Sequence, residues 1–170
     1  MIIQKDFCDI VNLIEEKRKE TYRKVNETMI SLYWELGKYL SEKIKGSEWG
    51  AKVVENLAQF LKEKYPAIRG FNKRGLYRMV QFYETYKDNE IVSPLVTQIN
   101  WSNNLLILSS TKFMEEKEFY IRMCIKENYS KRELNRQIAS GYYLRYMLSD
   151  GKALPSSEKT INDIFLIRKY

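Results

Sequence analysis

The stretch WGAKVVENLAQFLKEKYPAIRGFNKRGLYRMVQFYETYK, residues 49–87, predicts two helices joined by a short connection. In residues 49–64, apolar side chains recur at helical spacing and define a buried face: Val53, Val54, Leu57, Ala58 and Leu61. Pro66 ends this helix, because the residue before a proline avoids the helical region of backbone conformation. The next helix begins after Asn72, a residue type that caps helix N-termini, and continues to about Lys87. Its predicted buried face is Leu76, Met79, Val80, Tyr83 and Tyr86.

Upstream of this pair, residues 4–45 predict one long helical region. Apolar side chains form two series with steps of three and four, the spacing of helices packed side by side. The first series is Phe7, Val11 and Ile14, and the second is Tyr22, Val25, Met29, Leu32, Leu36 and Tyr39. They fall out of register near Arg18, so the region either contains a stutter there or breaks into two helices. A continuous helix would be about 60 Å long, which leaves room for a partner along its side.

Downstream, the sequence predicts more helices and no sheet. Glycine and proline, which punctuate strands and turns, number only seven and three. After a loop over residues 88–100, we expect a short helix over 101–108 and a longer one over 114–128. Ser130 and Glu133 have the spacing of a capping box, and the helix that they open is predicted to continue to about Leu148. The fold class is therefore all-α, with a long N-terminal helix and a helix-turn-helix-like pair.

The domain organisation predicted from the sequence is one helical domain over residues 1–150 and a linker or tail over 151–170. A chain of 170 residues is long enough for one ordinary domain with a sizeable core. After Gly151 the composition changes, since residues 152–160 are polar and contain a proline. Residues 161–170 have no evident packing partner in the sequence pattern.

The composition excludes several classes of catalytic site. The chain has no histidine, which excludes Ser-His-Asp triads, Cys-His pairs and histidine metal sites. Cys8 and Cys124 make no disulfide framework and indicate a reducing compartment. We find no glycine-rich phosphate loop and no convergent carboxylate set, and therefore expect no catalytic residue, no metal site and no cofactor. No apolar run approaches a membrane span and the N-terminus lacks a signal-peptide profile, so we expect no membrane contact and a cytoplasmic location.

The net charge of +7 is concentrated in two windows of the sequence. Residues 62–87 hold seven basic and two acidic side chains, and residues 117–145 hold seven basic and three acidic ones. A basic stripe on one face of a protein is typical of nucleic-acid binding. A hydrated lysine-rich surface with no ligand is the alternative interpretation of the same charge.

The helix after Asn72 is the best candidate for contact with nucleic acid, most simply duplex DNA. Near the start of such a helix, Asn, Arg and Gln side chains can reach base edges and phosphates in a major groove. The predicted contacts on this helix are Asn72, Lys73, Arg74, Tyr77, Arg78 and Gln81. Lys62, Lys64 and Arg69 lie upstream and are expected to contact the phosphate backbone without sequence preference. The connection of roughly seven residues is longer than that of a tight helix-turn-helix, and an ordinary amphipathic helix remains the alternative.

A second basic surface is predicted around the start of the last helix. Its residues are Arg122, Lys126, Lys131, Arg132 and Arg136. The capping box explains the start of this helix without any function, so this surface is the weaker candidate. Trp34 and Trp101 stand next to apolar helical positions and are expected to anchor the core rather than to stack on bases.

Three stretches of the chain resemble the N-terminal domain of YhcG-type proteins, a bacterial family of predicted PDDEXK nucleases. They are LYWELGKYL (residues 32–40), the helix pair of residues 49–86, and the segment from QINWSNN to LNRQI (residues 98–138). The resemblance implies a helical domain that binds DNA in a helix-turn-helix-like manner and precedes a separate nuclease domain. The segment Gly70-Phe71-Asn72-Lys73-Arg74 is similar to the family's glycine-phenylalanine-serine-arginine start.

The sequence departs from the family pattern in two places. Asn103 and Asn104 follow Trp101-Ser102, where the family usually has histidine, so any role of that histidine is lost. The chain ends where the nuclease domain of the family would begin, and we therefore expect a DNA-binding module that is not itself an enzyme. The alternative is a protein-interaction module that dimerises, or binds a partner, through the long N-terminal helix. A free-standing nuclease with an unfamiliar site is the third hypothesis.

Overall fold

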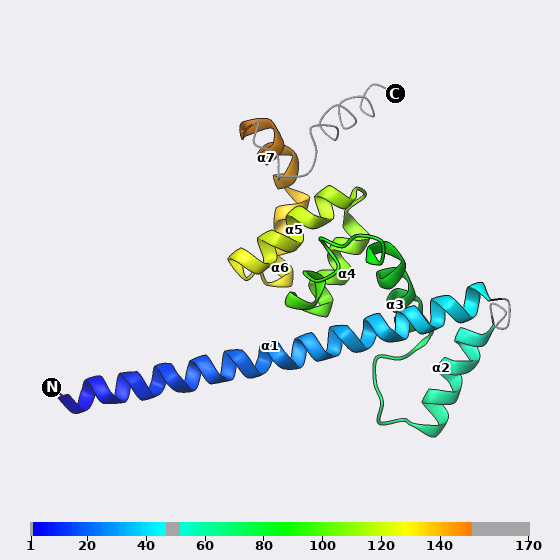
Figure 1. The fold of residues 1–170 in the computed structure, drawn as a ribbon, viewed down its shortest axis with the longest axis horizontal. Helices are drawn as coiled ribbons and strands as arrows, with labels where there is room; N and C mark the ends of the chain where they lie inside the picture. The colour runs from blue at the N-terminus through cyan, green and yellow to red at the C-terminus, as the bar shows by residue number, and fades with distance from the viewer. Residues whose placement is uncertain (1, 47–51, 151–170) are drawn as a thin grey trace. The chain divides into compact units, whose positions relative to one another are not determined.

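The computed structural model of the chain describes residues 2–46 and 52–150, and in these ranges it contains helices and no strand (Figure 1). The predicted all-α class with a long N-terminal helix is confirmed. The helices are α1 (Ile2–Lys45), α2 (Val53–Lys64), α3 (Lys73–Tyr86), the 3₁₀ helix η1 (Val96–Gln98), α4 (Trp101–Ser110), α5 (Met114–Glu127), α6 (Lys131–Ala139) and α7 (Tyr142–Asp150). In the described ranges they form two compact units, divided between Trp101 and Ser102, which we describe separately.

Helix α1 runs without interruption through 44 residues, about 66 Å at ~1.5 Å per residue. The change of register near Arg18 is therefore a stutter within one helix, and the alternative of two helices is wrong. A stutter inserts one extra step of four residues into the apolar spacing, which the backbone accommodates by a local change in winding.

The face of α1 that packs in the first unit is not the predicted seam. Ile30 and Leu40 are fully buried, and Leu36 packs against the core, but most of the seam stays exposed. The exposed members include Tyr22, Val25, Met29, Leu32 and Tyr39. Gly37 explains the choice of face, since a Cβ atom there would lie 2.2 Å from the carbonyl oxygen of Met79. The backbones of α1 and α3 meet at Gly37, and the neighbouring apolar face is left at the surface.

Helices α2 and α3 follow the prediction closely. Val54 is buried and the other residues of the predicted α2 face are half-buried. On α3, Leu76, Met79 and Tyr86 are buried as expected, and the fully buried Phe82 completes the face that the sequence analysis left incomplete. The start of the predicted second helix, residues 49–51, lies outside the described residues. These two helices contact each other, and α3 also packs on α1.

An aromatic cluster closes the core of the first unit. The ring of Phe82 stands edge-on to Trp34 at 5.7 Å and to Trp101 at 5.2 Å between centroids. Tyr33 packs against Trp101 at 4.7 Å. Edge-to-face pairs at these distances are favourable for aromatic rings, and this confirms the predicted core role of Trp34 and Trp101.

Polar contacts join α1 to α3 and to the loop before α4. Lys45 donates hydrogen bonds of 2.8 and 2.9 Å to the two carboxylate oxygens of Glu84, and Ser41 donates to the same group. The pKa of Glu84 is lowered, first by the hydrogen bond from Lys45. Nearer the middle of α1, Asn26 donates to the carbonyl oxygens of Thr97 and Ile99, both at 3.1 Å. These bonds hold the loop before α4 against α1.

In the second unit, α5, α6 and α7 contact one another around Phe119 and Tyr120. The Tyr120 hydroxyl accepts a hydrogen bond from the backbone N–H of Tyr143 at 3.2 Å. The single helix predicted over residues 130–148 is wrong, because α6 ends at Ala139 and α7 begins at Tyr142. Gly141 has φ of +66°, the left-handed conformation that ends helices.

The asparagines that follow Trp101 are buried in the second unit. Asn103 donates a hydrogen bond of 2.8 Å to the carbonyl oxygen of Tyr129, which fixes the residue before Ser130, the N-cap of α6. No helix in the described ranges is long and apolar enough to cross a membrane. The predicted linker and tail over 151–170 lie outside the described residues, and the single domain over 1–150 stays a prediction.

Candidate nucleic-acid interface

The start of α3 is fixed by a side-chain cap. The Oδ1 atom of Asn72 accepts a hydrogen bond of 2.9 Å from the backbone N–H of Gly75, which confirms the predicted N-cap. This bond engages the Asn72 side chain in the fold. Asn72 therefore marks the start of the candidate surface, with its Oδ1 atom engaged in the cap.

One side of α3 points away from the core and forms what we call the α3 strip: Arg74, Tyr77, Arg78 and Gln81. These positions are separated by three, one and three residues, so they share one side of the helix. Arg74, Tyr77 and Gln81 are exposed and Arg78 is half-buried. Since Leu76, Met79 and Phe82 occupy the opposite side, core packing holds the strip outward.

The two arginines of the strip are uncompensated in the structure. Neither Arg74 nor Arg78 makes an ion pair with any residue in the ranges 2–46 and 52–150. Lys73 differs, because its ammonium group donates a hydrogen bond to Glu55 on α2. That bond raises the pKa of Lys73. Of the predicted contacts at the start of α3, Arg74 and Arg78 carry the available positive charge.

Three more cations surround the connection between α2 and α3. Lys62, Lys64 and Arg69 are exposed and take part in no ion pair within the described part of the chain. The connection borders a cavity of about 460 Å³. Its wall includes Lys62, Pro66, Ile68, Phe71 and Lys73. Of the positive side chains of residues 62–78, Lys62 and Lys73 line this concave region, and Glu55, the partner of Lys73, lines it as well.

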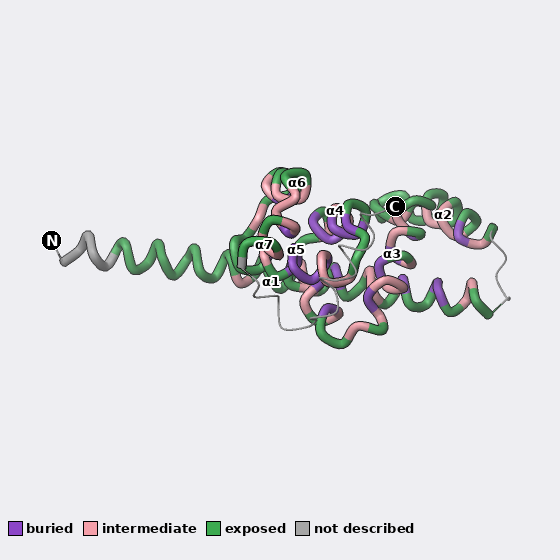
Figure 2. Tube along the Cα trace, turned by 90° about the horizontal axis from the view of Figure 1, so that it is seen from above, coloured by how far each residue is buried: buried purple, intermediate pink, exposed green. Residues whose placement is uncertain are grey.

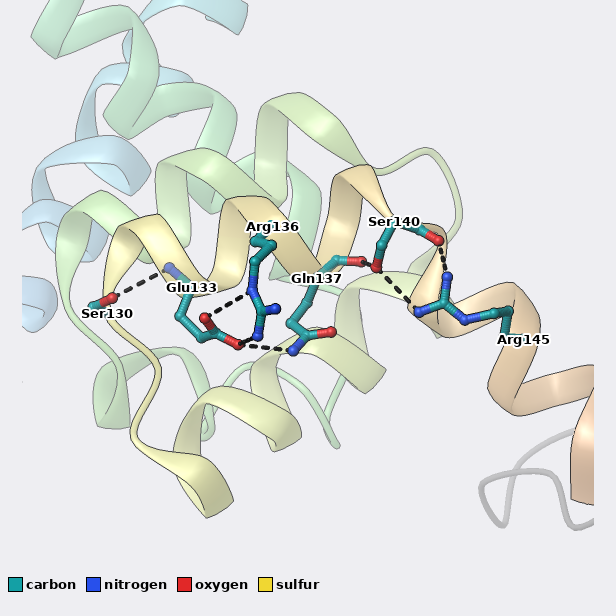
Figure 3. Close-up of polar contacts among 6 residues, drawn as sticks. All are labelled: Ser130, Glu133, Arg136, Gln137, Ser140 and Arg145. Carbon is teal, nitrogen blue, oxygen red and sulfur yellow. Dashed lines mark hydrogen bonds and ion pairs between the residues drawn. The ribbon is translucent and has the colours of Figure 1, made fainter.

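In the second basic surface, Arg136 is bonded to an acidic side chain (Figure 3). Ser130 accepts a hydrogen bond of 3.2 Å from the backbone N–H of Glu133, so the Ser130 half of the predicted capping box is confirmed. The carboxylate of Glu133 receives two bonds from Arg136, at 2.6 and 3.1 Å, and one from Gln137 at 2.8 Å. These bonds lower the pKa of Glu133, and they neutralise Arg136.

Other cations of this second surface are also paired. Arg122 forms a 2.8 Å ion pair with Glu118, and Lys126 lies 3.6 Å from Glu127. Lys131 and Arg132 are exposed without an ion pair in the described ranges. The surface that looked comparable in the sequence thus keeps two uncompensated cations out of its five.

The described residues offer no constellation for catalysis by a metal. No group of three or more Cys, Asp or Glu side chains in these ranges is placed to hold an ion. Cys124 is buried, and burial raises the pKa of its thiol to about 12, which keeps it protonated and unreactive.

Comparison of the sequence with known proteins places the chain in a family. Residues 9–145 match the family model described as DUF1016 N-terminal domain. The chain is 27% identical over 176 residues to an Escherichia coli (strain K12) protein named "Putative nuclease YhcG". That alignment covers 85% of the chain and 46% of the relative, so the chain spans about half the length of the relative. No solved structure matches the chain.

Proposed function

The chain belongs to the DUF1016 N-terminal domain family, and we propose that it binds duplex DNA through the α3 strip. The observation that supports this function best is the pair of uncompensated guanidinium groups of Arg74 and Arg78. They lie on the outer side of a helix whose inner side is fixed in the core. A polyphosphate ligand would supply the missing counter-charge and would release bound cations from the nucleic acid.

The dimensions and chemistry of the strip suit a major groove. An α-helix fits into the groove of B-form DNA, and arginine recognises guanine or phosphate through paired hydrogen bonds. In this arrangement Arg74, Arg78 and Gln81 reach bases or phosphates, and Tyr77 lines the same side. The α2–α3 pair then acts in a helix-turn-helix-like manner, with a longer connection than the tight motif.

The connection between α2 and α3 provides the phosphate contacts. Lys62 lines the concave region at the α3 N-terminus, where the helix dipole also favours negative charge, and Lys64 and Arg69 are exposed on the same connection. Lys73 contributes less than its position in the sequence indicates, because Glu55 already neutralises it. Backbone contacts of this kind orient a protein on DNA without reading its sequence.

The relative supports the proposal of a role in positioning a nuclease. That protein is named "Putative nuclease YhcG", and this chain aligns with less than half of its length. We propose that the present domain holds a nuclease domain on DNA, whether that domain belongs to the same polypeptide or to a partner. The binding step and the cleavage step would then reside in separate parts of the assembly.

A titration of duplex DNA followed by fluorescence anisotropy tests the proposed surface. Replacing both arginines, R74A/R78A, is expected to weaken binding at least tenfold, because two charge-assisted contacts are lost. The matched control is R132A/R136A, which removes the same number of arginines from α6. Equal affinities of wild type and R74A/R78A would refute DNA binding by the α3 strip.

A further inference from the structure

The N-terminal half of α1 exposes an apolar stripe that the fold does not use. Every residue from Phe7 to Lys19 is exposed, and Figure 2 shows this segment of the helix in green, the colour of exposed residues. The exposed fractions of Phe7 and Tyr22 are 61% and 66%. A lone helix in water is marginally stable and normally buries its apolar side. We therefore expect the apolar side of this segment to be covered by a partner surface.

The spacing of the stripe indicates that the partner is another helix. Its positions are occupied by the apolar residues Phe7, Val11, Ile14, Tyr22 and Val25, with the charged Arg18 at the same spacing between Ile14 and Tyr22. They follow one another at steps of four, three, four, four and three, so the stripe advances 3.6 residues per step on average. That value equals the period of a straight α-helix, and the stripe stays on one side without supercoiling.

The charges along this segment are divided into an acidic and a basic half. Residues 7–16 contain three acidic side chains and no basic one, whereas residues 17–26 contain five basic side chains and one acidic one. The acidic residue of the basic half, Glu20, already pairs with Lys17 and Lys24. Glu15, Arg18 and Lys19 make no ion pair in the part of the chain that the structure describes.

We propose that α1 pairs in antiparallel orientation with α1 of a second copy of this chain. The two-fold axis passes between residues 16 and 17, so residues 7–16 of each copy lie along residues 17–26 of the other. Val11 then faces Tyr22 of the second copy, and Glu15 lies beside Lys19 of the second copy. Such a contact is self-complementary, as a two-fold interface requires.

Charge and position favour the antiparallel arrangement over a parallel one. A parallel pair in register would place acidic halves together and basic halves together, which is unfavourable. The antiparallel overlap also ends near Asn26, where α1 begins to bond the loop before α4. The second copy therefore occupies the part of α1 that makes no such contact.

The apolar area is sufficient for a specific dimer. Six half-exposed apolar side chains in this segment, at roughly 80 Å² each, hide about 500 Å² per copy, given the 150–250 Å² that a whole aromatic side chain buries. They are Phe7, Ile10, Val11, Ile14, Tyr22 and Val25. The pair would bury about 1,000 Å², the lower limit for specific interfaces. We expect a reversible dimer whose population depends on concentration.

Sedimentation velocity of the full chain at several concentrations tests the pairing. The wild type is expected to approach a dimer at about 100 µM. V11K is expected to be monomeric, because it places a lysine against Tyr22 of the other copy in two layers of the stripe. L32K makes the same change on the same apolar side of α1, but beyond the overlap, and is expected to dimerise like the wild type. Circular dichroism checks that α1 stays helical in each variant.

Charge exchange tests the orientation. E15K is expected to raise the dissociation constant at least tenfold, and E15K/K19E is expected to restore it, because the pair of opposite charges is re-formed in reverse. D9K is the matched control, since Asp9 lies on the side of α1 opposite Val11. A monomeric wild type, or equal loss of dimer in V11K and L32K, would overturn the antiparallel pairing. So would a failure of K19E to rescue E15K.

Discussion

The first turns of α3 and α6 look alike in sequence and differ in the folded protein. Both helices begin at a capping residue, Asn72 or Ser130, and both carry two consecutive basic residues directly after it. On α3, the arginines at positions 74 and 78 have no acidic neighbour on their own side of the helix. On α6, Glu133 stands three residues before Arg136 and binds it through two hydrogen bonds.

The difference shows that the number of basic residues does not define a binding surface. An ion pair between exposed side chains contributes little to stability, but it removes a charge from the set available to a ligand. The α3 strip keeps its charge because its other members, Tyr77 and Gln81, are uncharged, whereas on α6 Glu133 lies within bonding distance of Arg136. The number of basic side chains without an acidic partner is the quantity that indicates a binding surface for DNA.

Charge reversal provides the largest test of this comparison. R74E/R78E is expected to weaken binding to duplex DNA by about 100-fold or more, because it converts two attractive contacts into repulsive ones. R132E/R136E changes the net charge by the same amount and is expected to cost less than tenfold. Fluorescence anisotropy at one fixed salt concentration measures both, and a larger loss in the α6 variant would reverse the assignment.

A backbone contact tests how the α3 strip is supported. In G37A, the added methyl group collides with the Met79 carbonyl, and we expect a loss of roughly 1–3 kcal/mol in the free energy of unfolding, as for other overpacked sites. Urea denaturation measures it. The expected loss concerns the first unit, so an unchanged denaturation midpoint would contradict the close approach of α1 and α3.

Neutralising Glu55 or Glu133 is expected to have a smaller effect on DNA affinity. E55Q releases Lys73 and E133Q releases Arg136, and each is expected to strengthen DNA binding by about two- to fivefold, since one cation becomes available. The slope of log affinity against log salt should steepen by up to about 0.9 for each cation that reaches a phosphate. If neither variant changes the affinity or the slope, the ion pairs are not what keeps Lys73 and Arg136 from contacting DNA.

The smallest effect concerns pH. The chain has no histidine, and the bonds from Arg136 and Gln137 lower the pKa of Glu133. A carboxylate with a lowered pKa stays ionised, and its pair persists, until the pH falls through that lowered value. DNA affinity at constant ionic strength is therefore expected to vary less than twofold between about pH 5.5 and 8. A marked rise in affinity toward pH 5.5 would show that the Glu133 pair opens earlier than this account allows.

Local signals in the sequence predicted most of the fold. The cap at Asn72, the stop at Pro66 and the apolar face of α3 depend on neighbours within one or two helical turns, and these features are confirmed. The break at Gly141 was missed because one glycine within a helical pattern is often tolerated. The packed side of α1 was missed for another reason, since two adjacent sides are apolar and only tertiary contact at Gly37 selects one.

The candidate site divides in the same way. The outward position of Arg74 and Arg78 follows from helical spacing, and the sequence was sufficient to place them on one side. The pairing of Arg136 with Glu133 could also have been predicted from the sequence, because the two residues are three positions apart on one helix. The bond between Lys73 and Glu55 was not, because it joins two helices across a connection whose path the sequence does not specify.

The most direct test of the α3 strip is a map of amide chemical-shift changes when duplex DNA is added to isotopically labelled protein. This account predicts the largest changes at residues 62–81, centred on the amides of Arg74 and Arg78, and small changes across α6. Changes centred on residues 130–137, with α3 unaffected, would contradict the central claim.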